Sequence, residues 1–233
     1  MSHPLRVGVV GAGGRVGVEL LNLIKQTPGL TARVGVGNHA QGFEMNVATL
    51  NDVDPQAVDI IVDFSAPKLF ELALSFCVAH NLPFVSGTTG LDDSHRGLLK
   101  KAGERIPTLW APNMSLGIAV LKSALKVLRA TRHFDFQVEE WHHRHKKDRP
   151  SGTALLLQNE LEQVIGRECP PPLVMRAGGI FGVHKVYAVS DEEIIQFEHT
   201  AINRTVFARG ALVAAQWLHN KPKGLYTLDD IIA

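Results

Sequence analysis

The densest group of ionisable side chains in this sequence lies just before a predicted helix. Its histidines and basic residues are His142, His143, Arg144, His145, Lys146, Lys147 and Arg149, and Ser151-Gly152-Thr153 follows. Histidine can donate a proton near neutral pH, and the free amides at a helix N-terminus, with two hydroxyls, can hold a carboxylate. The spacing therefore favours a site for an anionic substrate, with Lys146 supplying a mobile positive charge.

Other interpretations of this stretch stay open at the level of residue types. A metal site would need neutral imidazoles with acidic partners at ligand spacing, and adjacent histidines among several cations bind a cation poorly. The stretch would also suit a solvated charged loop, and His142 or His143 would each suit a hydrogen-bonded structural role. Arg144 and Lys147 are better explained as exposed charges or subunit contacts. We predict no metal site.

A glycine-rich motif lies near the N-terminus. The apolar run at residues 5–10 predicts a buried strand, and a helical pattern covers residues 15–26. Between them, glycines at 11, 13 and 14 allow the backbone to turn sharply and to approach a pyrophosphate, which the helix amides would face. Because a glycine loop between a strand and a helix is the context that this motif requires, we predict dinucleotide binding.

The acidic residue that usually accompanies such a loop is missing. A second strand is predicted at residues 30–36, and it is followed by Gly37, Asn38 and His39, with no carboxylate before Glu44. A carboxylate at this place normally binds the adenosine ribose hydroxyls. Without it, nothing obvious repels a 2′-phosphate, so we predict that both NADH and NADPH are used. Alternatively, backbone groups, Asn38 or a residue from elsewhere hold the ribose.

Two patterns of secondary structure position these motifs. Up to residue 113, strands alternate with helices; the further strands are expected at 60–63, 84–86 and 108–110, and the further helices at 68–80 and 93–104. This rhythm predicts βαβ units and a parallel sheet. The later elements are helices at 116–128, 153–165 and 204–218 and strands at 134–141, 173–176, 184–189 and 194–199. They predict a second, α+β domain with a mixed or antiparallel sheet.

The bulk properties indicate an ordinary soluble protein. With 233 residues and a formal net charge of +1, the chain has a sizeable core and no global field for nucleic acid or an anionic membrane. No apolar run reaches the length of a membrane span, and the N-terminus enters a strand without a cleavable leader. The two cysteines, Cys77 and Cys169, are far apart in the sequence. We therefore expect a cytoplasmic protein.

Beyond these local arguments, the sequence resembles a known family. The run His142-His143-Arg144-His145-Lys146-x-Asp148-x-Pro150-Ser151-Gly152-Thr153-Ala154 closely resembles the substrate motif of the 4-hydroxy-tetrahydrodipicolinate reductases, also called dihydrodipicolinate reductases. The resemblance extends over nearly the whole chain. Further matching segments are Gly11–Gly17, Gly87–Gly90, Ala111–Ser115 and Arg176–Gly178, with Gly182, His184, His199 and Arg204.

The resemblance implies an activity and roles for single residues. The activity is NAD(P)H-dependent reduction of (2S,4S)-4-hydroxy-2,3,4,5-tetrahydrodipicolinate to tetrahydrodipicolinate with loss of water, in diaminopimelate and lysine biosynthesis. His142 would be the catalytic proton donor and Lys146 a second donor or substrate anchor; His143, Ser151, Gly152 and Thr153 would bind the dicarboxylate. The cofactor site would be lined by Gly11, Ala12, Gly13, Gly14, Arg15, Val16, Gly87, Thr88, Thr89, Ala111, Pro112, Asn113 and Met114.

The family fold implies a Rossmann-like domain at residues 1–113, rejoined by residues 205–233. A substrate-binding and oligomerisation domain at residues 114–204 is inserted between them, and the assembly is a homotetramer. The chain departs from the family pattern at Gly37, Asn38, Ala66, Arg149 and Gly179, and it is shorter than many members. Two alternatives remain: a related dehydrogenase of a small amino-dicarboxylate, such as aspartate dehydrogenase, and a non-catalytic dinucleotide-sensing protein.

Overall fold

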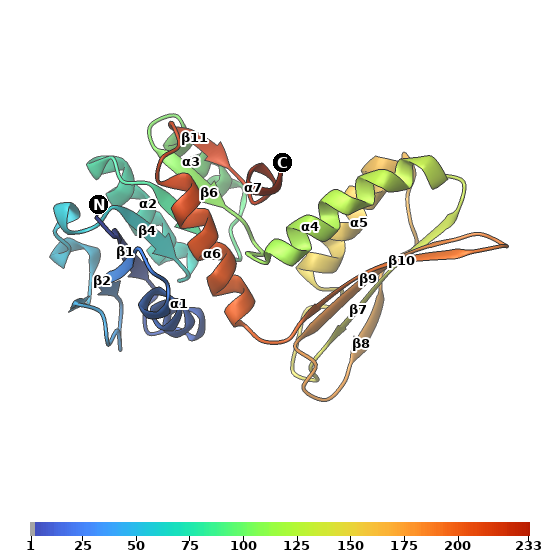
Figure 1. The fold of residues 1–233 in the computed structure, drawn as a ribbon, viewed down its shortest axis with the longest axis horizontal. Helices are drawn as coiled ribbons and strands as arrows, with labels where there is room; N and C mark the ends of the chain where they lie inside the picture. Colours follow the sequence, from blue (N-terminus) through green and yellow to red (C-terminus); the bar gives the residue numbers. More distant parts are fainter. Residues whose placement is uncertain (1–2) are drawn as a thin grey trace. The chain divides into compact units, whose positions relative to one another are not determined.

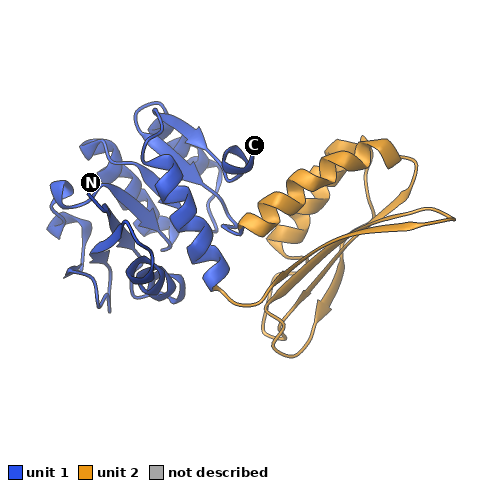
Figure 2. Ribbon diagram, in the orientation of Figure 1, with its two compact units in different colours: residues 1–115, 205–233 blue, residues 116–204 orange. Residues whose placement is uncertain are grey.

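The structure is a computed structural model that describes residues 3–233. The chain forms two compact units (Figure 2). Unit 1 contains the described residues up to Ser115 together with Thr205–Ala233, and unit 2 contains Leu116–Arg204. The insertion of unit 2 between two segments of unit 1 means that the chain leaves unit 1 once and returns to it once.

Unit 1 is built on a seven-stranded parallel sheet (Figure 1). Its strands, in the spatial order β11-β6-β5-β4-β1-β2-β3, are Gly224–Tyr226, Pro107–Trp110, Phe84–Ser86, Ile60–Asp63, Leu5–Val10, Leu30–Val36 and Met45–Val47. The helices are α1 (Arg15–Gln26), α2 (Pro67–His80), α3 (Asp93–Gly103), α6 (Thr205–Leu218) and α7 (Asp229–Ile232), with 3-10 turns η1 (Leu50–Asp52) and η2 (Pro55–Ala57). The predicted Rossmann-like parallel sheet is thereby confirmed.

The centre of this sheet is buried on both faces. All residues of β4 and β5 are buried, as the continuous apolar runs of a covered parallel sheet predict. Helix α1 packs beside α6, and α2 packs beside α3. Since the strands are parallel, their carboxyl ends lie at one edge of the sheet, and the loops that begin at Gly11, Gly37, Phe64, Gly87 and Ala111 all leave from that edge.

Unit 2 has a four-stranded mixed sheet beside two helices (Figure 1). The order is β10-β9-β7-β8, with β7 (Asp135–His142), β8 (Leu173–Arg176), β9 (Gly182–Val189) and β10 (Ile194–Ala201). Strand β7 is antiparallel to β9 and parallel to β8. The helical elements are α4 (Leu116–Ala124), the 3-10 segment η3 (Leu125–Thr131) and α5 (Gly152–Ile165). The prediction of a mixed or antiparallel sheet is confirmed in its mixed form.

Strand β7 has one buried and one partly exposed face. Phe136, Val138, Glu140 and His142 are buried, and the residues between them are more exposed. The apolar pair packs with α4, η3 and α5 in the core of unit 2. Because side chains alternate along a strand, the same register carries Glu140 and His142 onto the buried face. An alternation set by the core thus also positions two ionisable groups.

Several local expectations differ from the structure. The helix expected at 116–128 ends at Ala124 and continues as the tighter turns of η3, in which Thr131 Oγ1 donates to Leu128 O. Tightening of this kind is common at helix C-termini. The short elements β3, β11 and α7 were not expected from the sequence. No helix among residues 3–233 is both long and apolar enough to cross a membrane.

Candidate active site

The glycine loop connects β1 to α1 at the carboxyl edge of the parallel sheet. Gly11 has a φ of +80°, and a Cβ there would lie 2.4 Å from Phe64 O. A Cβ at Gly17 would lie 2.4 Å from Gly11 O, so only glycine allows α1 to begin this close to the loop. Gly14 is the N-cap of α1, and no side chain in the described chain caps the helix there. The first amides of α1 can therefore face an anion.

The loop after β2 lies against this glycine loop. A Cβ on Gly13 would lie 2.3 Å from Asn38 O, and Gly37 has a φ of +125°. The first carboxylate after β2 is Glu44, which forms an ion pair with Arg33. Residues 37–39 thus meet the glycine loop through backbone and carry no carboxylate.

A buried carboxylate, Asp63, links three strand ends of unit 1. It accepts hydrogen bonds from Ser65 Oγ at 2.5 Å, Ser86 Oγ at 2.7 Å and Thr88 Oγ1 at 2.7 Å. Trp110 Nε1 donates to Thr88 O at 3.0 Å, which adds the end of β6. Burial raises the pKa of Asp63 above its usual value, although the three hydroxyls oppose the shift. The carboxyl holds the loop after β5 in one position.

The predicted nicotinamide-side segments follow β5 and β6. Thr88 and Met114 are buried, and Ala111 N donates to Ser86 O at 3.1 Å. Asn113 Oδ1 accepts from Ser115 N at 2.8 Å. Two predicted cofactor loops therefore leave from the same sheet edge as the glycine loop. The loop after β5 contains Gly87, Thr88 and Thr89, the loop after β6 contains Ala111, Pro112, Asn113 and Met114, and the glycine loop contains Gly11, Ala12, Gly13, Gly14, Arg15 and Val16.

In unit 2, the buried carboxylate of Glu140 is the centre of a polar network. Arg176 donates to it in bidentate geometry, with Nη1 2.9 Å from Oε2 and Nη2 2.7 Å from Oε1. Ser151 N donates to Oε1 at 3.0 Å, and His142 Nδ1 bonds to Oε2. Burial alone would raise the pKa of Glu140, but the bonds from Arg176 and His142 outweigh it and lower the pKa. Glu140 is thus an ionised acceptor.

His142 is the last residue of β7 and is mostly buried. The pKa of His142 is lowered by burial, although the hydrogen bond and the charge of Glu140 partly offset this effect. The His184 ring lies 5.2 Å from the His142 ring, edge to face. Burial lowers the pKa of His184 to about 3, so this second imidazole is neutral at physiological pH. One of two adjacent imidazoles is therefore far easier to protonate than the other.

The segment between β7 and α5 carries the other predicted substrate residues. Lys146 Nζ lies 2.9 Å from Asp148 Oδ1, and His143 is partly buried. Ser151 is 1% exposed and is the N-cap of α5, with its Oγ accepting from Ala154 N at 3.2 Å. Gly152 is exposed and Thr153 is partly exposed at the first turn of the helix. Unlike Ser151, these last two residues are accessible to solvent.

Sequence reasoning did not assign roles to Glu140, Asp63 and Ser86. Arg176 and His184 were noted only as landmarks of the resemblance. A signal for Glu140 did exist: it falls on the apolar register of β7, where a carboxylate must be buried and hence paired. Asp63 likewise ends an apolar strand. In residues 3–233, no three histidine, cysteine or acidic side chains gather as metal ligands would.

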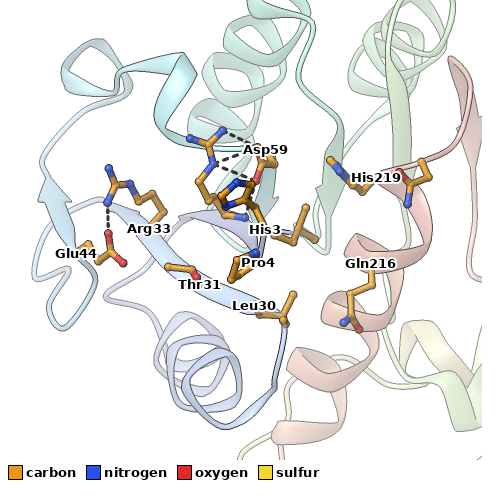
Figure 3. A pocket seen from close by; sticks show the side chains of 13 residues that line it. His3, Pro4, Leu30, Thr31, Arg33, Glu44, Asp59, Gln216 and His219 are labelled. Atoms are coloured by element: carbon orange, nitrogen blue, oxygen red, sulfur yellow. Dashed lines mark hydrogen bonds and ion pairs between the residues drawn. The ribbon is translucent and has the colours of Figure 1, made fainter. Parts of the chain in front are cut away.

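A groove of about 840 Å³ lies away from the glycine loop, near the amino ends of β1 and β2 (Figure 3). Its charged groups are paired with one another. Arg6 bonds to Asp59 through Nη2 at 2.7 Å, and Arg33 pairs with Glu44. The groove contains none of the predicted site residues and offers no uncompensated charge, so we do not consider it the active site despite its size.

Two family matches together cover nearly the whole chain. Residues 5–114 match the family described as dihydrodipicolinate reductase, N-terminus, and residues 114–232 match dihydrodipicolinate reductase, C-terminus. The chain belongs to the dihydrodipicolinate reductase family. Among its relatives is the 4-hydroxy-tetrahydrodipicolinate reductase of Bdellovibrio bacteriovorus, 44% identical over 98% of this chain and 96% of that protein. The reductase of Nitratiruptor sp. is 40% identical over 98% and 99%.

Solved structures agree with the fold of this dihydrodipicolinate reductase family member. The dipicolinate-bound dihydrodipicolinate reductase of Paenisporosarcina sp. TG-14 has a TM-score of 0.83 at 19% identity and covers 97% of this chain and 99% of that one. The aspartate dehydrogenase of Thermotoga maritima has a TM-score of 0.54 at 11% identity, covering 95% and 99%. The fold is thus shared with the runner-up enzyme class, whereas the family matches of this chain and the relatives named above are dihydrodipicolinate reductases.

Proposed function

We propose that this chain catalyses the NAD(P)H-dependent reduction of 4-hydroxy-tetrahydrodipicolinate to tetrahydrodipicolinate, with loss of water, on the route to diaminopimelate and lysine. The named relatives support the reaction because they cover the chain almost completely. The observation that carries the proposal is in unit 2. A buried imidazole, His142, bonds to the ionised Glu140, and the N-terminus of α5 begins only ten residues later.

The cofactor fits the glycine loop of unit 1. The N-terminus of α1 has no side-chain cap, and the glycines leave room for backbone alone, which are the two properties that a pyrophosphate needs. Residues 11–16 would hold the pyrophosphate, and residues 87–89 and 111–114 would lie beside the nicotinamide. When bound, the nicotinamide supplies a hydride. The absence of an acid at residues 37–39 supports use of both NADH and NADPH.

The substrate is a six-membered ring with two carboxylates, and α5 begins with groups that suit one of them. The amides of Gly152 and Thr153 and the Thr153 hydroxyl would bind a carboxylate, and the helix dipole would add to the attraction. Lys146, now paired with Asp148, would neutralise the same or the other carboxylate, with His143 as a further contact. Ser151 supports this cradle as the cap of α5.

His142 donates the proton that the ring requires after hydride addition at its 4-position. Its pKa is lowered by burial, which makes the protonated imidazole a stronger acid. A positioned acid of this kind contributes about 10²–10⁴-fold to a rate. Lys146 assists the loss of water or holds a carboxylate. On this proposal, unit 1 binds the cofactor, and unit 2 binds the substrate and donates the proton.

The direct experiment follows cofactor absorbance after the substrate is generated by a coupled synthase, with product identified by mass spectrometry. We expect oxidation of NADH and NADPH that depends on this substrate. A dehydrogenase of an amino-dicarboxylate would instead reduce NAD(P)⁺ with L-aspartate, and a sensing protein would bind cofactor without turnover. Either of those results would replace the proposed reaction.

We also propose a homotetramer. The two edge strands of the unit 2 sheet carry exposed apolar residues, Leu173 and Met175 on β8 and Ile194 on β10, and Met175 pairs with Trp141 of β7. A patch of this kind marks an interaction surface, and the family resemblance supports other copies of this chain as its occupant. Light scattering should give the mass of four chains, and Met175→Glu should reduce it. A monomeric parent at micromolar concentration would refute the assembly.

Both cysteines are free thiols, and Cys77 is buried. Burial raises the pKa of this thiol well above its usual value, so it stays reduced and unreactive in a reducing compartment. Together with the biosynthetic activity of the named relatives, this supports a location in the cytoplasm, which fractionation of the source cells would test.

A further inference from the structure

Beyond the reaction itself, we propose that Glu140 is the positioning residue of His142. On this proposal, which rests on the proposed function, Glu140 fixes the imidazole in its Nδ1–H form, and Gly182 keeps open the path by which Nε2 delivers the proton. Neither residue needs to touch the substrate.

The hydrogen bond between Glu140 and His142 has a defined donor and a defined acceptor. An ionised carboxylate can only accept hydrogen bonds, and Glu140 is held ionised by its cationic partners. His142 Nδ1, which faces Glu140 Oε2, must therefore be the donor. In the neutral imidazole the other nitrogen, Nε2, then has no proton and is the atom that gains and loses it.

The Glu140 carboxylate, which accepts the bond from His142, is held rigidly. Arg176 has a side chain that is only 2% exposed, and it binds both Glu140 oxygens while Nη2 also donates to Asp148 O at 2.6 Å. Ser151 N occupies Oε1 as well. The carboxylate cannot rotate without breaking several bonds, so the imidazole it orients is fixed too. The same clamp holds the loop that carries Lys146 and Ser151.

Gly182 leaves space beside Nε2 of His142. Gly182, the first residue of β9, is buried, and a Cβ built on it would lie 3.2 Å from His142 Nε2. The same Cβ would lie 3.5 Å from His142 Cδ2, so a side chain at this position would crowd the imidazole beside Nε2. The φ of Gly182 is not in the left-handed region, so the backbone does not itself require glycine. The absence of a side chain at Gly182 therefore matters because it leaves the space beside Nε2 unfilled.

The charged and titratable groups facing His142 give a defined pH response. The Glu140 charge favours protonated His142, whereas Lys146 and Arg176 disfavour it. His184, from β9, is neutral and adds no charge. Glu140→Gln removes the favourable charge next to His142, so the His142 pKa should fall. The protonated form of His142, which turnover needs, is then lost at a lower pH than in the parent protein.

The first test needs neither turnover nor substitution of Glu140. In ¹⁵N-histidine spectra of the full-length protein above the imidazole titration, the signals that disappear in His142→Gln should have the pattern of an Nδ1–H tautomer. An Nε2–H tautomer would overturn the proposal, whatever the enzyme turns out to reduce. A protein with the expected tautomer but no turnover would instead contradict the proposed function alone.

The second test is kinetic. In Glu140→Gln, the high-pH limb of kcat should move down by about one pH unit, and kcat at neutral pH should fall at least about tenfold. The cofactor Kd, measured by fluorescence, should stay within about twofold, since the cofactor is assigned to unit 1. A pH limb that stays in place or moves up in a folded variant would overturn the positioning role, because loss of packing would relieve the burial that lowers the His142 pKa and would therefore raise this pKa.

The third test keeps the proposal falsifiable if Glu140→Gln does not fold. Gly182→Ala should lower kcat at least about tenfold and leave the His142 tautomer unchanged, because only the path to Nε2 is filled. Gly179→Ala is the matched control: it is exposed, nothing lies within 4 Å of its Cβ, and its φ is not left-handed. Equal activity of parent, Gly182→Ala and Gly179→Ala would overturn the proposed path.

Discussion

Each unit of the molecule buries one carboxylate near its site, and the two are satisfied by different kinds of donor. Asp63 in unit 1 accepts from the hydroxyls of Ser65, Ser86 and Thr88, and burial raises its pKa. Glu140 in unit 2 accepts from a guanidinium, an imidazole and an amide, and its pKa is lowered. Neutral donors do not offset the loss of water around a charge, whereas cationic donors do.

The difference matches what each unit is proposed to bind. The loops around Asp63 are ordered by neutral hydroxyls and not by cationic side chains, and glycine backbone and helix amides would make most of the cofactor contacts. Around Glu140 the charges lie close together, as the proposed proton donor and the proposed dicarboxylate site would require. The comparison predicts that substitutions in unit 2 have large, charge-dependent effects and that those in unit 1 have smaller, charge-independent ones.

The largest effect on stability is expected from Arg176→Ala. It leaves Glu140 buried without its guanidinium and should lower the free energy of unfolding by about 3–5 kcal/mol. Urea titration followed by fluorescence measures it. Arg6→Ala is the control in unit 1, because its ion pair with Asp59 is partly exposed and should contribute only about 0–1 kcal/mol. Equal losses in the two variants would remove the distinction between buried and exposed pairs.

Substitutions in the carboxylate cradle of unit 2 should come next. Pyridine-2,6-dicarboxylate has both acids at nearly the substrate's spacing and should compete with substrate, not with cofactor. Thr153→Val should weaken this inhibitor by about 1–3 kcal/mol, Lys146→Ala should weaken it further, and raised salt should weaken it in the parent. Lys147→Ala, at an exposed neighbouring position, is the control. Unchanged inhibition in both cradle variants would move the dicarboxylate elsewhere.

In unit 1 the corresponding test is Thr88→Val, which removes one of the Asp63 hydroxyls. We expect the cofactor Kd to rise about fivefold, since one neutral hydrogen bond contributes about 1 kcal/mol. The Kd should have little added salt dependence. Thr108→Val is the matched control: this buried threonine lies near the start of β6, and its Oγ1 donates to Ile106 O. A similar loss of cofactor affinity in the control would show that the Asp63 cluster has no special role.

The smallest effect expected is the difference between the two cofactors. Without an acid or a basic clamp at Gly37-Asn38-His39, kcat/KM for NADH and NADPH should differ by less than about tenfold, or roughly 1.4 kcal/mol. Steady-state kinetics with both cofactors measures the ratio. A hundredfold preference for either cofactor would mean that a charged group outside this loop contacts the adenosine ribose or its 2′-phosphate.

Sequence patterns located the long elements well, and for a physical reason. Helix α1 begins at Arg15 and ends at Gln26 as expected, because its apolar spacing and the Pro28-Gly29 that follows are local signals. Strands β3 and β11, of three residues each, exist only because a sheet edge provides partners for them. Nothing in their own residues gives a period long enough to detect.

The candidate site divides in the same way. His142, Lys146 and the start of α5 lie within a short run of sequence, so their types and spacing could be recognised together. Apart from His142 and Ser65, each two residues away, the partners of Glu140 are 11 and 36 residues away and those of Asp63 are 23 and 25 residues away. Such networks are set by strand register and not by local spacing, and for that reason the distant partners of the two buried carboxylates became visible only in the structure.

The central claim is that His142 supplies the proton, and turnover of His142→Gln tests it most directly. Rapid mixing with saturating substrate and cofactor gives kcat, and cofactor titration of the same variant gives Kd. An uncharged amide keeps some hydrogen bonding but cannot deliver a proton, so kcat should fall by about two or more orders of magnitude with Kd nearly unchanged. Retention of more than about a third of the parent kcat, a loss below about 1 kcal/mol, would contradict the account.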